Sequence, residues 1–242
     1  MRLADHFVRS GDALFRYRGQ LPLLMLPLFA LGLRDAALPA LLPPGARAAQ
    51  AGAVLVALCG LAVRVVAVGT APEGTSERST TSPRASRLRT TGLYSLVRHP
   101  LYLGNTITAV GLAAFTTRWY LPVIVLLLGV LYHERIAARE EAFLEDRFGD
   151  EFRRWAATVP AVIPRLSAYT RSDTPFVWKR VLGREFHGLM TIASVVFVLD
   201  LARRALADGQ LRPDPLWGWF FAVSAAIFVV FTGVKKTTKI FR

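Results

Sequence analysis

Long apolar runs constrain the fold of this chain more than any other feature. A membrane-spanning helix needs about 20 mostly apolar residues, and shorter runs can span by tilting or by borrowing polar ends. The four clear runs are 46–70, 101–117, 121–132 and 216–234, and two weaker ones are 21–33, which 38–42 extends, and 187–201. We therefore predict an all-α, polytopic membrane protein with about six transmembrane helices and a cytoplasmic amphipathic segment.

The same runs predict a single integral membrane domain over residues 1–242. Within it, 1–87 would hold the first helices and a loop, 88–165 a central core, and 166–242 two further transmembrane helices. The stretch from 70 to 86 is rich in Ser, Thr, Gly and Pro, which is typical of a loop.

Charge placement gives the predicted helices an orientation. With six spans and both termini inside, 24 of the 30 Lys and Arg residues lie on the inner side. This distribution follows the positive-inside rule, so the net charge of +13 indicates topology and attraction to anionic lipid. Nucleic-acid binding is not favoured, because the basic residues are spread over four membrane-flanking segments. We predict a bacterial inner (plasma) membrane protein with both termini in the cytoplasm.

Residues 98–104, Arg-His-Pro-Leu-Tyr-Leu-Gly, form what we call the His-Pro motif, where charged sequence meets an apolar run. Proline suits the first turn of a helix and disfavours helical geometry at the residue before it, so a helix is expected to begin at Pro100. Its free N–H groups suit an anionic or polar ligand group. Gly104 permits close approach of a neighbouring helix or of a ligand. Taken alone, the motif is better explained by interface anchoring.

Residues 140–164 form what we call the Glu-Glu motif. It begins with Glu140-Glu141 on a charged helix that continues the apolar run 121–132, and Phe148-Gly149 is expected to end that helix. Phe152 and Trp155 then recur at helical spacing, which predicts a short amphipathic helix lying on the membrane. The simpler interpretations are a solvated acidic helix face and a packing stripe.

The two motifs become informative together. Only about four residues, 118–121, connect the two apolar runs between them, so the two helices must run antiparallel and their cytoplasmic ends must meet. One place then collects His, Arg, Tyr and several carboxylates. No metal site is predicted, because there is no His pair at ligand spacing and the sole cysteine, Cys59, lies in an apolar run.

At these residues the chain resembles the membrane methyltransferases typified by isoprenylcysteine carboxyl methyltransferase, whose relatives act on phospholipid amines and other lipid groups. The resemblance covers residues 88–165 and implies that S-adenosylmethionine binds at the cytoplasmic helix ends while a lipid acceptor arrives from the bilayer. The cofactor contacts that it implies are His99, Pro100, Tyr102, Gly104, Glu140 and Glu141.

The acceptor is expected to be an anionic carboxylate or phosphate of a lipid or lipidated molecule, because the inner side is rich in Arg. Arg98 and Arg139 would orient such an acceptor, and Glu134 or His133 would serve as a base if the acceptor were an amine. Two alternatives stay open. Some NADPH-dependent membrane steroid and sterol reductases share a similar Arg-His-Pro-x-Tyr element, but they carry an acidic residue where this chain has Asn105. The other alternative is a non-catalytic membrane protein.

Overall fold

The computed structural model describes residues 24–37, 45–71 and 86–238, together with positions 7, 10, 11, 14 and 17. Within these residues the regular elements are helices, and one isolated bridge pairs Gly92 with Thr170. The α-helices are α2 (Leu26–Ala37), α3 (Ala46–Gly69), α4 (Pro100–Ala114), α5 (Tyr120–Phe148), α6 (Asp150–Thr158), α7 (Trp178–Leu182), α8 (Phe186–Asp208) and α9 (Pro215–Thr237), and the 3₁₀ helices are η2 (Leu93–Ser95) and η3 (Leu166–Ala168). The all-α prediction is confirmed, whereas most of the predicted loop 70–86 lies outside the described residues.

Two helix boundaries and one unbroken helix confirm the local sequence signals. Helix α4 begins at Pro100, with His99 in non-helical geometry as its N-cap. Helix α5 runs without a break for 29 residues, from the apolar run through the Glu140–Glu141 pair. It ends before Gly149, whose φ of 53° is a conformation that glycine adopts without strain.

Among the described residues, three helices are long and apolar enough to cross a membrane: α3, α5 and α9. The protein is therefore a polytopic membrane protein, with fewer clear spans than the six predicted. Helix α4 has only 15 residues, or about 22 Å at 1.5 Å per residue. Helix α8 is 23 residues long but carries Asp200, Arg203 and Arg204 in its second half. In the described part of the first predicted span, helix α2 covers 26–37 and follows a 3₁₀ turn at 24–25.

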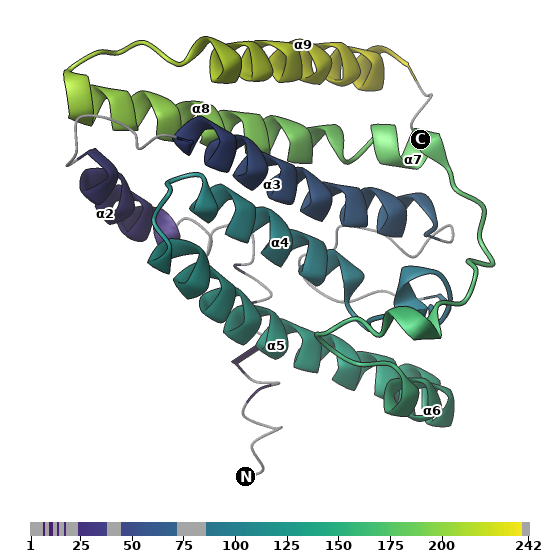
Figure 1. Ribbon diagram of the computed structural model, residues 1–242. Coiled ribbons are helices and arrows are strands. Elements are labelled where there is room, and N and C mark those ends of the chain that lie inside the picture. The colour runs from purple at the N-terminus through teal and green to yellow at the C-terminus, as the bar shows by residue number, and fades with distance from the viewer. Residues whose placement is uncertain are drawn as a thin grey trace.

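Helices α3, α4 and α5 lie side by side, and α8 and α9 stack on the other side of α3 (Figure 1). Small residues bring α3 and α4 almost into backbone contact. A Cβ atom added to Gly104 would lie 2.7 Å from the carbonyl oxygen of Gly60, and one on Gly111 would lie 2.4 Å from the amide of Ala57. The hydroxyl of Thr108 donates to the carbonyl of Ala57 at 3.2 Å. This crossing fixes α4, and with it the His-Pro motif, against α3.

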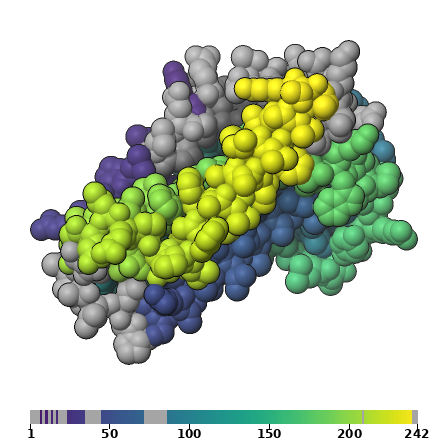
Figure 2. Space-filling model, turned by 90° about the horizontal axis from the view of Figure 1, so that it is seen from above, coloured from purple at the N-terminus to yellow at the C-terminus, as the bar shows by residue number. Residues whose placement is uncertain are grey.

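The α8–α9 hairpin completes the main hydrophobic core. Ile192 and Val196 of α8 are buried there with residues of α3, and Trp217 of α9 meets Phe115 edge to face at 5.2 Å between ring centroids. Seen from above, α9 forms the outer surface over α8 (Figure 2). The predicted last two helices are thus packed into the domain rather than appended to it.

Helix α6 differs from its prediction in what its apolar face contacts. Phe152 and Trp155 are buried in a small cluster with Leu88 and Val159, against Tyr94 and the end of α5. An apolar face that is buried on its own chain is not available to lipid. The interpretation of Phe152 and Trp155 as a packing stripe is therefore confirmed. The prediction that this face of α6 lies on the membrane is wrong.

Candidate active site

The start of α4 and the C-terminal half of α5 meet through four polar side chains. His99 Nε2 lies 2.8 Å from Oε1 of Glu141, and the hydroxyl of Tyr102 donates to Oε1 of Glu140 at 2.6 Å. His99 Nδ1 is 3.7 Å from Oε2 of Glu140, so the ring sits between both carboxylates, and its side chain is only 10% exposed. The predicted meeting of the two motifs is confirmed.

Arg98 joins the same cluster from the residue before the helix cap. Its Nη1 donates to Oε2 of Glu141 at 3.0 Å, and its backbone N–H donates to the carbonyl of Pro160 at 2.9 Å. Nearby, the backbone N–H of Arg165 donates to the carbonyl of Leu96 at 3.0 Å. Pro160 in the Glu-Glu motif and Arg165 just after it therefore hold the segment that leads into the His-Pro motif.

A cleft of about 540 Å³ opens beside Arg98. It is lined by Arg98, residues 156–160 and residues 163–165, so it combines two guanidinium groups with an apolar wall. The Nε atom of Arg98 is buried and has no hydrogen-bond partner among the described residues. Arg98 thus links the cleft to the carboxylate pair.

His133 extends the cluster along α5 in a way that sequence spacing did not predict. Its ring stacks on Tyr102 with centroids 4.9 Å apart and planes 17° apart. The hydroxyl of Thr106 lies 2.9 Å from its Nδ1 and donates to the backbone carbonyl of Tyr102. His133 therefore supports the ring of Tyr102 from the α5 side.

Tyr94 and Trp155 secure the loop that leads into the site. The indole N–H of Trp155 donates to the backbone carbonyl of Tyr94 at 3.2 Å. Burial raises the pKa of the Tyr94 hydroxyl, and the neighbouring Arg89 opposes part of that rise. The Tyr94 side chain is consequently neutral and acts as a packing and hydrogen-bonding group.

The remaining predicted site residues lie elsewhere. Gly104 faces α3, where the neighbouring helix occupies the space that its missing side chain leaves. Glu134 is exposed on α5, and no hydrogen bond or ion pair joins it to the cluster in the described part of the chain. Arg139 lies on α5 beside position 11 of the N-terminal segment, where a Cβ on Gly11 would come within 3.2 Å of Arg139 Cβ. Pro100 is buried at the first helical position.

Three polar residues missed at the sequence level lie directly behind Gly104. Nε and Nη2 of Arg64 on α3 each lie 2.9 Å from one carboxylate oxygen of Glu185, which precedes α8. Nη1 of Arg64 donates to the side-chain oxygen of Asn105 at 2.6 Å. The available signal was an arginine interrupting an apolar run, which is costly in a membrane without a partner.

The cluster presents two carboxylates, a histidine, a tyrosine hydroxyl and a guanidinium around one point. Carboxylates can accept hydrogen bonds from ribose hydroxyls or an ammonium group, and the guanidinium suits a carboxylate or phosphate. In the described residues, no group of three or more His, Cys, Asp and Glu side chains could hold a metal ion.

Comparison with known proteins gives the cluster a family context. Residues 50–151 match the family model described as phospholipid methyltransferase. The chain is 37% identical over 127 residues to the nickel-cobalt-cadmium resistance protein NccN of Alcaligenes xylosoxydans xylosoxydans, covering 50% of this chain and 58% of that protein. It is 38% identical over 87 residues to the cobalt-zinc-cadmium resistance protein CzcN of Cupriavidus metallidurans, covering 36% and 40%.

A third relative connects the chain to a named methyltransferase. The chain is 36% identical over 78 residues to the protein-S-isoprenylcysteine O-methyltransferase of Schizosaccharomyces pombe, covering 32% of this chain and 33% of that protein. The chain thus spans from a third to somewhat over half the length of these three relatives. No solved structure matches. Residues 50–151, which hold the His-Pro motif and the Glu140–Glu141 pair, are therefore similar to the phospholipid methyltransferase family.

Proposed function

We propose that this protein transfers a methyl group from S-adenosylmethionine to a membrane-embedded acceptor, an anionic carboxylate or phosphate of a lipid or lipidated molecule. The observation that carries the proposal is the pairing of His99 and Tyr102 with Glu140 and Glu141, inside the segment that matches a methyltransferase family. A shared fold alone does not establish a reaction, whereas a polar cluster at a helix terminus offers defined contacts to a ligand.

The residues present fit adenosylmethionine at this place. Glu140 and Glu141 supply acceptors for its hydroxyl and amino groups, and the buried Nε of Arg98 supplies a donor for its carboxylate. When bound, adenosylmethionine supplies an electrophilic methyl group on a sulfonium. His99 and Tyr102 orient the two carboxylates, so the hydrogen-bond acceptors are already in a fixed position before the ligand binds.

The acceptor needs no general base if it is anionic. Its oxygen is already ionised at neutral pH and forms the new bond to carbon while the carbon–sulfur bond breaks, in a single in-line displacement. Arg98 and Arg165 at the 540 Å³ cleft support an anionic headgroup, and the apolar wall there supports a lipid. Arg139 remains a second proposed orienting group. An amine acceptor would require a base, for which exposed Glu134 or His133 is proposed.

The proposed topology has six spans in a bacterial inner membrane, with both termini and the site cytoplasmic. Helices α2, α4 and α8 would be the additional spans beyond α3, α5 and α9. Asp200 is 1% exposed and pairs with both Arg203 and Arg204, which lowers the cost of holding these charges near the outer interface. A reporter that is active only outside the membrane, fused after Arg242, should be inactive.

Ligand-dependent stability separates the proposed function from its alternatives. Adenosylhomocysteine should raise the unfolding temperature of the purified protein, because a ligand that binds the folded state stabilises it. NADPH should have no effect. Stabilisation by NADPH alone would support the reductase, and stabilisation by neither would support a non-catalytic protein. Incubating membranes with radiolabelled adenosylmethionine and extracting the lipids would then identify the acceptor.

The similarity to NccN and CzcN supports a second proposal, that this methyl transfer contributes to metal resistance. Expression of the wild-type chain in a cobalt-sensitive bacterial host should increase cobalt tolerance, and a Glu141→Gln variant should not. Equal tolerance with both would separate the resistance from methyl transfer.

A further inference from the structure

A buried ion pair ties the C-terminal hairpin to the back of the candidate site. Glu185 is 5% exposed and binds Arg64 through both carboxylate oxygens, each at 2.9 Å. Such a fork fixes the orientation of the guanidinium as well as its position. The third donor of Arg64, Nη1, reaches Asn105 on α4 at 2.6 Å. Three helical regions far apart in the sequence therefore meet at one guanidinium.

The position of this pair along α4 links it to the site. Asn105 is three residues after Tyr102 and therefore about one turn away on a neighbouring part of the helix surface. Gly104 lies between them, and a Cβ atom added there would be 2.8 Å from Arg64 Cγ. The aliphatic stem of Arg64 thus covers the backbone at Gly104, while its head holds Asn105. Other contacts between α3 and α4 include the close approaches at Gly104 and Gly111 and the hydrogen bond from Thr108 to the carbonyl of Ala57.

Removal of one partner from such a pair is costly, because the other charge is left buried without compensation. Glu185 lies outside the family-matched segment 50–151, whereas Arg64 and Asn105 lie within it. We propose that Glu185 is a positioning residue: by holding Arg64, and through it Asn105, it fixes the first turns of α4 and hence the geometry of His99 and Tyr102. This inference rests on the proposed adenosylmethionine site and assigns the C-terminal hairpin a role in it.

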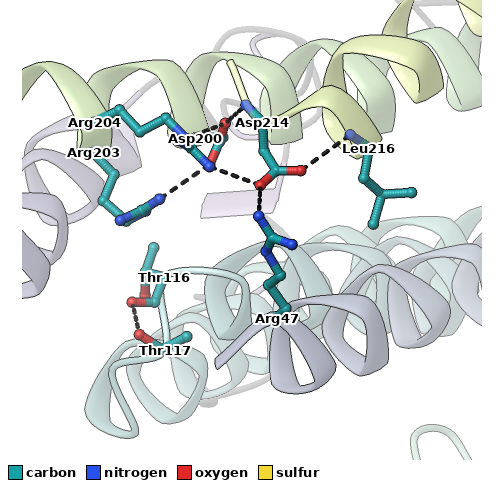
Figure 3. Close-up of polar contacts among 8 residues, drawn as sticks. All are labelled: Arg47, Thr116, Thr117, Asp200, Arg203, Arg204, Asp214 and Leu216. Carbon is teal, nitrogen blue, oxygen red and sulfur yellow. Dashed lines mark hydrogen bonds and ion pairs between the residues drawn. The ribbon is translucent and has the colours of Figure 1, made fainter. Parts of the chain in front are cut away.

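The opposite end of the same hairpin provides a matched control. Asp214 caps α9, is 5% exposed, and binds Arg47 at 2.8 Å and Arg204 at 2.7 Å (Figure 3). It is therefore also a buried carboxylate that joins the hairpin to α3 through an arginine. It lies at the α9 start, near the α3 start, whereas Glu185 lies by the α8 start. If both ion pairs served only to stabilise the fold, replacing either carboxylate should have the same effect on stability and on ligand affinity.

The test compares Glu185→Gln, Asn105→Ala and Asp214→Asn with the wild type. Each purified protein is titrated with adenosylhomocysteine by calorimetry, and its thermal unfolding is recorded without ligand. Glu185→Gln should weaken adenosylhomocysteine binding about ten- to 100-fold, because small displacements of positioned groups carry penalties of that order. Asp214→Asn should lower the unfolding temperature and leave the dissociation constant unchanged.

Asn105→Ala keeps the proposal testable if Glu185→Gln does not fold. Asn105 is exposed, so its truncation leaves the Arg64–Glu185 pair in place and removes only the last contact of the relay. It should weaken adenosylhomocysteine binding with little loss of thermal stability. Unchanged affinity in this variant, or in a folded Glu185→Gln protein, would overturn the positioning role. A wild-type protein that does not bind adenosylhomocysteine would overturn the proposed function, and this inference with it.

Discussion

The contact between Gly104 and α3 makes a sharp prediction about which glycines the fold requires. A Cβ atom on Gly104 would lie 2.7 Å from the backbone oxygen of Gly60. Non-bonded carbon atoms need about 3.5 Å between them, and the same Cβ would lie 2.8 Å from Arg64 Cγ, so Gly104→Ala must displace its neighbours on α3 by roughly 0.7 Å or more. Gly129 on α5 is also buried in a helix, but a Cβ there would meet only the side chain of Thr106, at ordinary distances of 3.5 and 3.7 Å.

The two alanine variants therefore differ in one term of the free energy of unfolding. Both gain about 1 kcal/mol because alanine favours a helix over glycine. Only Gly104→Ala incurs the overpacking penalty, which is typically about 1–3 kcal/mol. At about 2–4 °C per kcal/mol for a chain of this size, Gly104→Ala should unfold several degrees below Gly129→Ala.

Thermal unfolding in detergent, with and without adenosylhomocysteine, measures both parts of this prediction. The displacement of α4 should also weaken ligand binding in Gly104→Ala, because Tyr102 moves with it. Equal unfolding temperatures for the two variants would refute the close helix contact. If Gly104→Ala kept its stability and lost only ligand binding, the glycine would instead leave room for the cofactor, which is the role that the family resemblance implies.

Three further predictions concern single side chains. Glu141→Gln should abolish adenosylhomocysteine binding while circular dichroism shows an unchanged helix content, and calorimetry with unaltered affinity would contradict it. Trp155→Phe keeps the buried ring but removes the hydrogen bond to the carbonyl of Tyr94, so it should cost about 1 kcal/mol in denaturant unfolding; a larger loss would mean that the ring itself repacks. The hydrogen bond from Thr91 holds the pKa of Asp173 below its usual value, so the stability it contributes is present above the unfolded-state pKa and is lost as the pH falls through the folded value. Thr91→Val should therefore raise that pKa in an NMR titration, and an unchanged pKa would assign the shift to other groups.

The sequence carried enough information to predict the site because its signals are local. Pro100 marks a helix start and Gly149 a helix end, and the short connection 115–119 leaves the two helices only an antiparallel arrangement. The start of α4 and the end of α5 then meet by geometry, which is why His99 and Glu141 could be predicted to lie together although they are 42 residues apart.

Non-local pairings could not be predicted in the same way. Arg64 and Glu185 are 121 residues apart, and no spacing rule selects one acidic residue as the partner of an arginine in an apolar run. The partner of the α6 apolar face could not be predicted either, because the amphipathic pattern of Phe152 and Trp155 is the same whether the face contacts lipid or protein. Only the presence of Leu88 and Tyr94 opposite that face decides it. The number of spans could not be predicted from the sequence for a related reason. Charges within a helix cost less when tertiary partners neutralise them, and the sequence does not show those partners.

The contacts within the cluster constrain how a ligand can bind. Both oxygens of Glu141 already have protein partners, and Tyr102 occupies one oxygen of Glu140. Each carboxylate oxygen can accept a second hydrogen bond, so a ligand can add contacts here, but each added bond contributes only about 1 kcal/mol net. Much of the affinity is therefore expected from the guanidinium of Arg98 and the apolar wall of the adjoining cleft. The carboxylate pair therefore acts mainly by fixing orientation. That is also why the elements that brace α4 from behind, Arg64 and Glu185, bear on the site although they lie outside it.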